Sequence, residues 1–151
     1  MKQAIYLFLV LIISLGCKNN EITQSTVHFG ESFTLKANGI ISISSSETND
    51  NNAKIHFSKI NFDSRCPKSM CNLCYASTAS INLLLIHDKD TSNIPLTILG
   101  CLDEYECNDE LYYRKDTLGY RFCLLRLDPY PYGNTQVDPT NYSVKLNIVR
   151  L

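Results

Sequence analysis

Apolar and polar residues alternate along most of this chain with a period of two, which is the pattern of half-buried β-strands. The alternation is clearest over residues 54–62 and 142–149. Residues 79–87 are more uniformly apolar, which is typical of an interior strand. Four further segments carry strand signals: residues 32–36, 40–43, 94–99 and 118–127. Pro95 lies near the start of one of them, so we expect that strand at a sheet edge.

These segments predict a single all-β domain over residues 27–151, an antiparallel β-sandwich or related small barrel of about seven or eight strands. Residues 44–52 (SSSETNDNN) are polar and turn-rich, and we expect a loop there. The one stretch suited to a helical turn is 103–115. A length of 151 residues fits one domain, and 44% hydrophobic against 19% charged residues argues against a disordered chain.

The N-terminus carries a targeting signal rather than a membrane span. Lys2 precedes an apolar run over residues 4–15, which is shorter than the roughly 20 residues that a bilayer core requires. The run matches the apolar region of a secretory signal peptide. We therefore predict a signal peptide over residues 1–16.

The stretch ISLGC at residues 13–17 resembles the lipobox of bacterial lipoproteins. The resemblance implies that the chain is cut before Cys17, that this cysteine carries the lipid, and that residues 17–26 tether the domain to a membrane. Lys18 implies, by the same resemblance, the outer membrane of the cell envelope, on its periplasmic or its surface face. Ser14 and Gly16 also suit an ordinary signal peptidase, which would leave a secreted form with a free Cys17.

The remaining six cysteines are an even number, as expected for disulfide pairing in an oxidising compartment. They form two groups of three: Cys66, Cys71 and Cys74, then Cys101, Cys107 and Cys123. Because each group holds an odd number, at least one bond must join the two groups. The Cys71-x2-Cys74 spacing also occurs in zinc sites and in redox motifs, so both stay as alternatives. We favour disulfides, because a redox motif needs a βαβ pattern that this sequence lacks, and we predict no bound metal.

Two motifs carry a second resemblance. DSRCP at residues 63–67, with a cysteine pair close behind it, and LDPYP at 127–131 resemble a group of small bacterial secreted proteins and lipoproteins. That group has no assigned activity, so the resemblance implies a fold and nothing about chemistry. In this motif Asp63 and Ser64 are expected to fix a turn. Arg65 can pair with Asp63 or point outward as a carboxylate-binding fork.

A binding surface for an envelope protein or a small ligand is predicted from Arg65, Tyr75, Tyr130 and Tyr132, on loops within residues 63–78 and 101–133. Tyrosine offers a large contact area with a polar tip. Prolines hold the last two in an extended loop. For the other tyrosines, at 112, 120 and 142, a place within strands is the simpler interpretation.

Charge and motif content exclude several functions. With 14 basic and 15 acidic residues, nothing favours nucleic acid as a partner. The acidic stretch 101–119 lacks the residue order of a calcium loop. His28, His56 and His87 stand in no nucleophile motif, so we predict no catalytic residue and no cofactor. The expected function is a lipid-anchored envelope protein that acts as a non-catalytic binding or accessory module; the alternatives are a structural lipoprotein and a zinc or redox cysteine protein.

Overall fold

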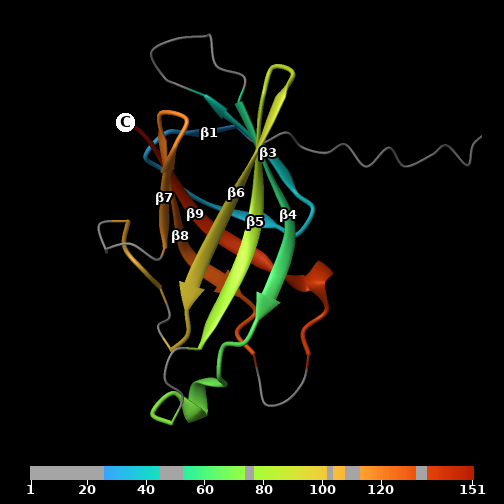
Figure 1. The fold of residues 1–151 in the computed structure, drawn as a ribbon, viewed down its shortest axis with the longest axis vertical. Coiled ribbons are helices and arrows are strands. Elements are labelled where there is room, and N and C mark those ends of the chain that lie inside the picture. The colour runs from blue at the N-terminus through green and yellow to red at the C-terminus, as the bar shows by residue number, and fades with distance from the viewer. Residues whose placement is uncertain (1–25, 45–52, 74–76, 102–103, 108–112, 132–135) are drawn as a thin grey trace, which may run out of the picture.

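A computed structural model describes residues 26–44, 53–73, 77–101, 104–107, 113–131 and 136–151. The chain forms two β-sheets that pack face to face (Figure 1). The five-stranded sheet has the order β1 (Thr26–His28), β3 (Ile40–Ser44), β4 (Ala53–Asp63), β5 (Thr78–His87) and β6 (Asp90–Leu99). The four-stranded sheet has the order β2 (Ser32–Lys36), β9 (Ser143–Arg150), β8 (Tyr120–Asp128) and β7 (Arg114–Thr117). All strand pairs are antiparallel except β1 with β3, so the predicted all-β, two-sheet architecture is confirmed.

The core lies between the two sheets and follows from the alternation in the sequence. Phe57 of β4 and its cross-strand neighbour Leu83 of β5 face Phe122 and Leu146 of the other sheet within one apolar cluster, and all four are fully buried. Full burial of one such side chain contributes about 1.5–3 kcal/mol. The prediction of an interior strand is confirmed, because β5 lies between β4 and β6. Pro95 indeed lies in an edge strand, where its missing N–H can face outward.

Two strands were not predicted. β1 has three residues, and β7 (RKDT) has no apolar residue, so neither produces an alternating pattern. β7 is held by its pairing with β8 across a tight turn, in which Leu118 and Gly119 both have positive φ. This turn also explains why β8 begins at Tyr120 and not at residue 118.

The expected helical turn is wrong where the structure describes it, because Arg114 and Lys115 belong to β7. Turns of 3-10 helix occur instead at η1 (Lys68–Met70) and η2 (Pro139–Asn141), each next to a proline. Of the predicted loop over residues 44–52, Ser44 belongs to β3, and residues 45–52 lie outside the described residues. No helix in the described part of the chain is long and apolar enough to cross a membrane.

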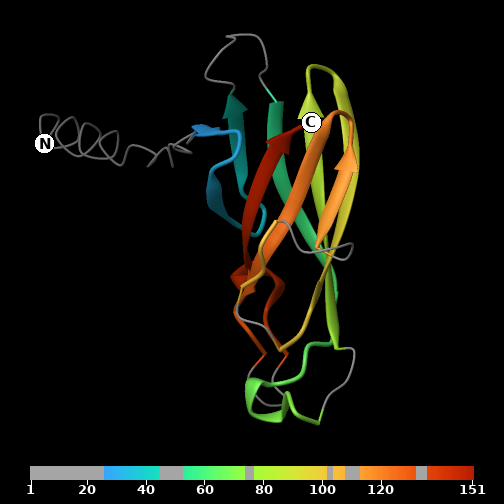
Figure 2. The same cartoon turned by 90° about the vertical axis from the view of Figure 1, so that its left-hand side faces the viewer.

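The sandwich has two distinct ends (Figures 1 and 2). The hairpin end comprises the β5–β6 turn, Asp88–Lys89, and the β7–β8 turn, Leu118–Gly119. The disulfide end comprises residues 63–73, 100–101, 127–131 and 142, at the bottom of Figure 1. β4 runs from the first end to the second.

Candidate functional site

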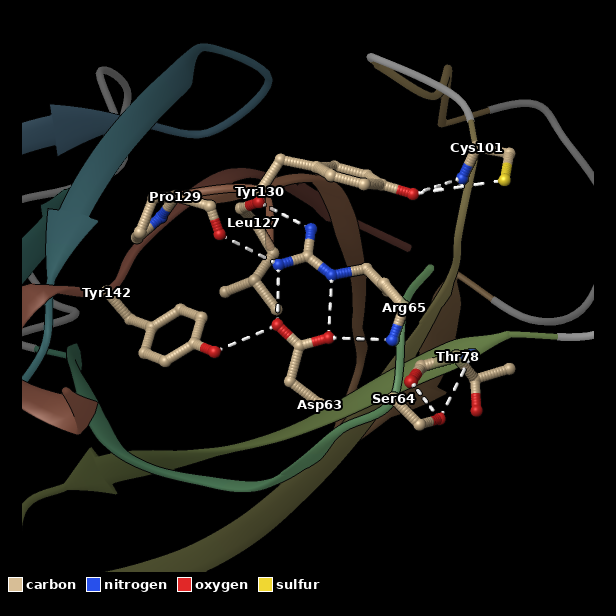
Figure 3. Close-up of polar contacts among 9 residues, drawn as sticks. All are labelled: Asp63, Ser64, Arg65, Thr78, Cys101, Leu127, Pro129, Tyr130 and Tyr142. Carbon is tan, nitrogen blue, oxygen red and sulfur yellow. Dashed lines mark hydrogen bonds and ion pairs between the residues drawn. The ribbon is translucent and has the colours of Figure 1, made fainter. Parts of the chain in front are cut away.

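The disulfide end is organised around a buried ion pair between Arg65 and Asp63, in the DSRCP motif (Figure 3). Their side chains are 2% and 6% exposed. The Arg65 Nη2 lies 2.7 Å from Asp63 Oδ2, and its Nε lies 2.9 Å from Oδ1. The backbone N–H of Arg65 also donates to Oδ1, at 3.0 Å. Arg65 therefore pairs with Asp63, which decides between the two alternatives that the sequence left open.

The same guanidinium reaches across to the other sheet. Arg65 Nη1 donates to the carbonyl of Leu127 at 2.7 Å, and Nη2 donates to the carbonyl of Pro129 at 3.0 Å. Both carbonyls belong to the LDPYP motif, which begins in the last two residues of β8. Arg65 thus joins the end of one sheet to the end of the other through a buried charge that makes four side-chain hydrogen bonds. Such a charge is tolerated inside a protein only when it is paired and hydrogen-bonded.

Tyr142 completes the environment of the carboxylate. Its hydroxyl donates to Asp63 Oδ2 at 2.9 Å, and the side chain is buried just before β9. Burial and, to a smaller extent, the hydrogen bond to Asp63 together raise the pKa of Tyr142 to about 12. The hydroxyl therefore stays protonated and keeps donating to Asp63 at neutral pH.

Tyr130 covers the other side of the guanidinium. The Arg65 guanidinium carbon lies 4.8 Å from the centroid of the Tyr130 ring, within cation–π range. The Tyr130 hydroxyl accepts a hydrogen bond from the backbone N–H of Cys101 at 2.7 Å. It also lies 3.9 Å from the sulfur of Cys101 and 4.0 Å from that of Cys71. Tyr130 is half-buried and connects the ion pair to a disulfide.

The Cys71–Cys101 disulfide joins the loop after β4 to the end of β6, as the odd number of cysteines in each group required. A second disulfide, Cys107–Cys123, lies within the second group. Cys66 is also disulfide-bonded, to a partner outside the described residues. The prediction of disulfides is therefore confirmed for the cysteines that the structure describes.

Gly100 allows the chain segments around Ser77 and Tyr130 to approach it closely. Its N–H donates to the carbonyl of Ser77 at 2.6 Å. A Cβ on Gly100 would lie 2.2 Å from Ser77 Oγ and 3.2 Å from the Tyr130 hydroxyl, so a larger residue would collide there. Ser64 fixes the facing segment, because both its backbone N–H and its hydroxyl donate to the carbonyl of Thr78 at 2.8 Å.

Large apolar side chains are exposed at the disulfide end and on the adjoining residue of β4. Leu73 is 77% exposed, Met70 is 45% exposed, and both lie on the short loop that Cys71–Cys101 fixes. Phe62, at the end of β4, is 50% exposed. Exposed apolar side chains that gather on one surface often mark an interaction site.

Two hollows flank this loop and the ion pair. One, of about 360 Å³, is lined by Arg65, Lys68, Ile98, Arg126, Leu127, Asp128 and Tyr130. The other, of about 200 Å³, is bordered by apolar and proline side chains that include Ile60, Phe62, Val137 and Pro139. A third hollow, of about 540 Å³, lies at the hairpin end between the two turns, where Leu118 and Tyr120 face His87, Asp90, Thr91 and Ser92.

The structure thus brings together two of the four residues predicted for a binding surface, Arg65 and Tyr130. They line a hollow, but most of the polar groups of Arg65 are bonded internally. Tyr75 and Tyr132 lie outside the described residues, as do Cys17 and Cys74. No local sequence pattern predicted that Tyr142 or the carbonyl acceptors would contact this pair, because they lie far from residue 65 along the chain. The exposure of Met70 and Leu73 was detectable in principle, as apolar residues within a polar, cysteine-rich loop.

Within the described ranges, no group of three or more His, Cys, Asp or Glu side chains is placed to hold a metal ion. His56 and His87 lie in β4 and β5, as expected, and His28 lies in β1. The nitrogen Nδ1 of His28 lies 3.3 Å from the hydroxyl of Ser44. Nδ1 of His87 lies 3.5 Å from a carboxylate oxygen of Asp88, on an exposed turn. These histidines therefore lie on the surface near the hairpin end or within a strand, away from the Asp63–Arg65 pair.

Comparisons with protein-family models, with curated proteins and with solved structures found no match to this chain.

Proposed function

We propose that this protein is a lipid-anchored protein of the bacterial cell envelope, and that its disulfide end is a non-catalytic binding module for a protein partner. One observation carries the proposal. A loop held by the Cys71–Cys101 disulfide presents Leu73 and Met70 to solvent instead of burying them. Met70 and Leu73 are neighbours in one turn, where the N–H of Leu73 donates to the carbonyl of Met70 at 2.8 Å, and adjoining exposed apolar side chains can mark a protein interaction site.

The rigidity of this end supports binding rather than a passive loop. The disulfide, the hydrogen bonds of Tyr130 and the Arg65–Asp63 pair all restrict the segment that carries the exposed side chains. A loop that is already ordered loses little conformational entropy when a partner docks on it.

The envelope location rests on two lines of support. The disulfides fit an oxidising compartment outside the cytosol. The lipobox-like stretch ending at Cys17 provides the attachment point, and two or three acyl chains hold a small protein on a membrane stably. The resemblance of the DSRCP and LDPYP motifs to small secreted proteins and lipoproteins agrees with this location.

The binding role is tested by site-specific photo-crosslinking in cells that make the full chain. A photoreactive amino acid at Leu73 should give one discrete crosslinked protein, while the same group at Thr34, exposed on β2, should give none. A Met70→Ser change in the Leu73-labelled chain should weaken that crosslink. Equal labelling from both positions, or none from either, would leave a structural lipoprotein as the better description.

The anchor is tested separately. Intact-mass spectrometry of the membrane-extracted protein should show acyl groups on Cys17, and Cys17→Ala should release the protein from the membrane. An unmodified Cys17 would refute the lipid anchor without bearing on the loop.

A further inference from the structure

We propose that the hairpin end lies against the lipid surface that anchors the chain, with Leu118 placed among the lipid headgroups. The proposal rests on the lipid attachment at Cys17 that is proposed above. It assigns opposite tasks to the two ends of the sandwich: the hairpin end contacts the bilayer, and the disulfide end points away from it.

The length of the tether restricts the orientation of the domain. Eight residues, 18–25, separate Cys17 from Thr26 at the start of β1. Nine steps along a fully extended chain span at most about 30 Å. Thr26 must therefore lie within about 30 Å of the bilayer surface.

The strand register places Thr26 near the hairpin end. Val27 pairs with Ile43, Ile43 pairs with Ala53, and Ala53 pairs with His87. These four residues form one row across the five-stranded sheet, and the row ends one residue before the β5–β6 turn. Figure 2 shows β1, in blue, near the level of the β7–β8 turn and below the β5–β6 turn. The tether therefore leaves the domain beside the hairpin end.

The reverse orientation is less favourable for the tether. Thr26 lies in the row of Ile86, and the seven steps from Ile86 to Ala79, opposite the end of β4, cover about 23 Å at about 3.3 Å per residue. The loop that carries Leu73 and Met70 extends beyond that point (Figure 1). With this loop on the bilayer the tether would have to be stretched toward its full length, which costs conformational entropy, whereas the hairpin end lies beside the point where the tether leaves the domain.

The hairpin end also offers an apolar contact. Leu118 is 57% exposed at the tip of the β7–β8 turn. Leu151, 63% exposed, lies beside it, because its N–H donates to the carbonyl of Gly119 at 2.9 Å. Leu118 has φ +55°, a conformation in which turns of this kind favour asparagine or glycine. A leucine kept in a strained, exposed position is explained if its side chain contacts lipid.

Electrostatic attraction to the lipid does not account for a contact between the hairpin end and the bilayer. Lys89 and Arg150 are exposed at this end, and Asp88 and Asp90 balance them. A single leucine would hold an untethered protein on a bilayer only weakly. The anchor supplies a high effective concentration, so a weak contact is enough to fix the orientation.

The absence of tryptophan from the chain allows a direct test. Leu118→Trp and Leu73→Trp each give a protein with a single tryptophan, one at each end. The purified, lipidated full-length proteins are reconstituted in vesicles of phosphatidylethanolamine and phosphatidylglycerol, with or without brominated acyl chains. We expect the brominated lipid to quench L118W at least twofold, with a blue-shifted emission, and to leave L73W unchanged.

Vesicle flotation separates the two proposals. If the protein does not float with the vesicles, the anchor at Cys17 fails. If it floats but L118W is not quenched, or L73W is quenched as strongly, the proposed orientation is wrong. Lys89→Trp, at the tip of the neighbouring turn, is a second probe in case L118W folds poorly, and it should also be quenched more than L73W.

Discussion

The two ends of the sandwich are stabilised by different means. At the disulfide end a buried arginine makes bonds to both sheets, and a disulfide fixes the loop beside it. At the hairpin end the two turns are held mainly by the ladders of their own hairpins, together with the hydrogen bond from Leu151 to Gly119. The first end depends on a few strong, long-range contacts, and the second on many local ones.

This difference determines how each end responds to substitution. A bond network with a buried charge fails as a unit, because every group left without its partner is costly. The stability of a two-residue turn depends on how readily its two residues adopt the φ values that the turn requires. A single substitution there therefore has a small effect. Substitutions at the disulfide end should therefore have large effects, and those at the hairpin end small ones.

The largest effect is expected from Arg65→Ala. It leaves the buried Asp63 carboxylate with fewer donors, and the carbonyls of Leu127 and Pro129 without a partner. Removing one member of a buried ion pair costs about 3–5 kcal/mol of unfolding free energy. Urea denaturation without reductant measures the loss.

Arg121→Ala is the matched control. Arg121 makes a bidentate pair with Asp116 of similar geometry, at 2.7 and 2.8 Å, but on the solvent side of the β7–β8 hairpin. Exposed pairs contribute little. The urea midpoint of this variant should stay close to that of the parent, and an equal loss for both arginines would contradict the distinction between the two ends.

An intermediate effect is expected from Tyr142→Phe, which removes one donor to Asp63 and keeps the ring. A hydrogen bond to a charged group contributes about 1.5–3 kcal/mol, so the free energy of unfolding should fall by about this amount at pH 7. The loss should be smaller than for Arg65→Ala, because two Arg65 side-chain donors remain on the carboxylate.

The same variant has a pH signature. Burial raises the pKa of Tyr142 to about 12, above its ordinary value of 10. The stability that this tyrosine contributes is therefore fully present below pH 10 and is lost as the pH rises toward 12. Denaturation at pH 9 and at pH 11.5 should show a smaller alkaline loss for Y142F than for the parent. Part of the alkaline loss that remains in Y142F arises from Tyr105, because burial raises the pKa of Tyr105 as well. Identical alkaline losses would show that Tyr142 does not titrate as proposed.

The smallest effect, and the only stabilising one, is expected from Leu118→Asn. Asparagine adopts positive φ more readily than leucine and suits the first position of this turn before Gly119. The free energy of unfolding should rise by about 0.5–1 kcal/mol, measured by thermal denaturation of the soluble domain. Leu118→Ala shortens the side chain without relieving the backbone and should give no such gain.

Much of the fold could be predicted from the sequence, because burial imposes an alternating pattern on the longer strands. β7 could not, since its four residues are polar and its place depends on the turn before β8. This turn was not predicted, because leucine rarely adopts positive φ and therefore does not indicate a tight turn.

The candidate site was predictable only in its local part. Asp63 and Arg65 are two residues apart, and their pairing could be expected from that spacing alone. The contacts with Leu127, Pro129 and Tyr142 depend on how the two sheets pack, which no local pattern specifies.

The position of β9 has a consequence for the order in which the molecule assembles. β9 lies between β2 and β8 and is the sole strand partner of β2 within the described chain. As the polypeptide is synthesised, β2 emerges early and stays without its strand partner until residues 143–150 have followed. The five-stranded sheet can pair earlier, since its strands follow one another closely. The five-stranded sheet can thus form while synthesis continues, and the four-stranded sheet closes only once β9 has followed.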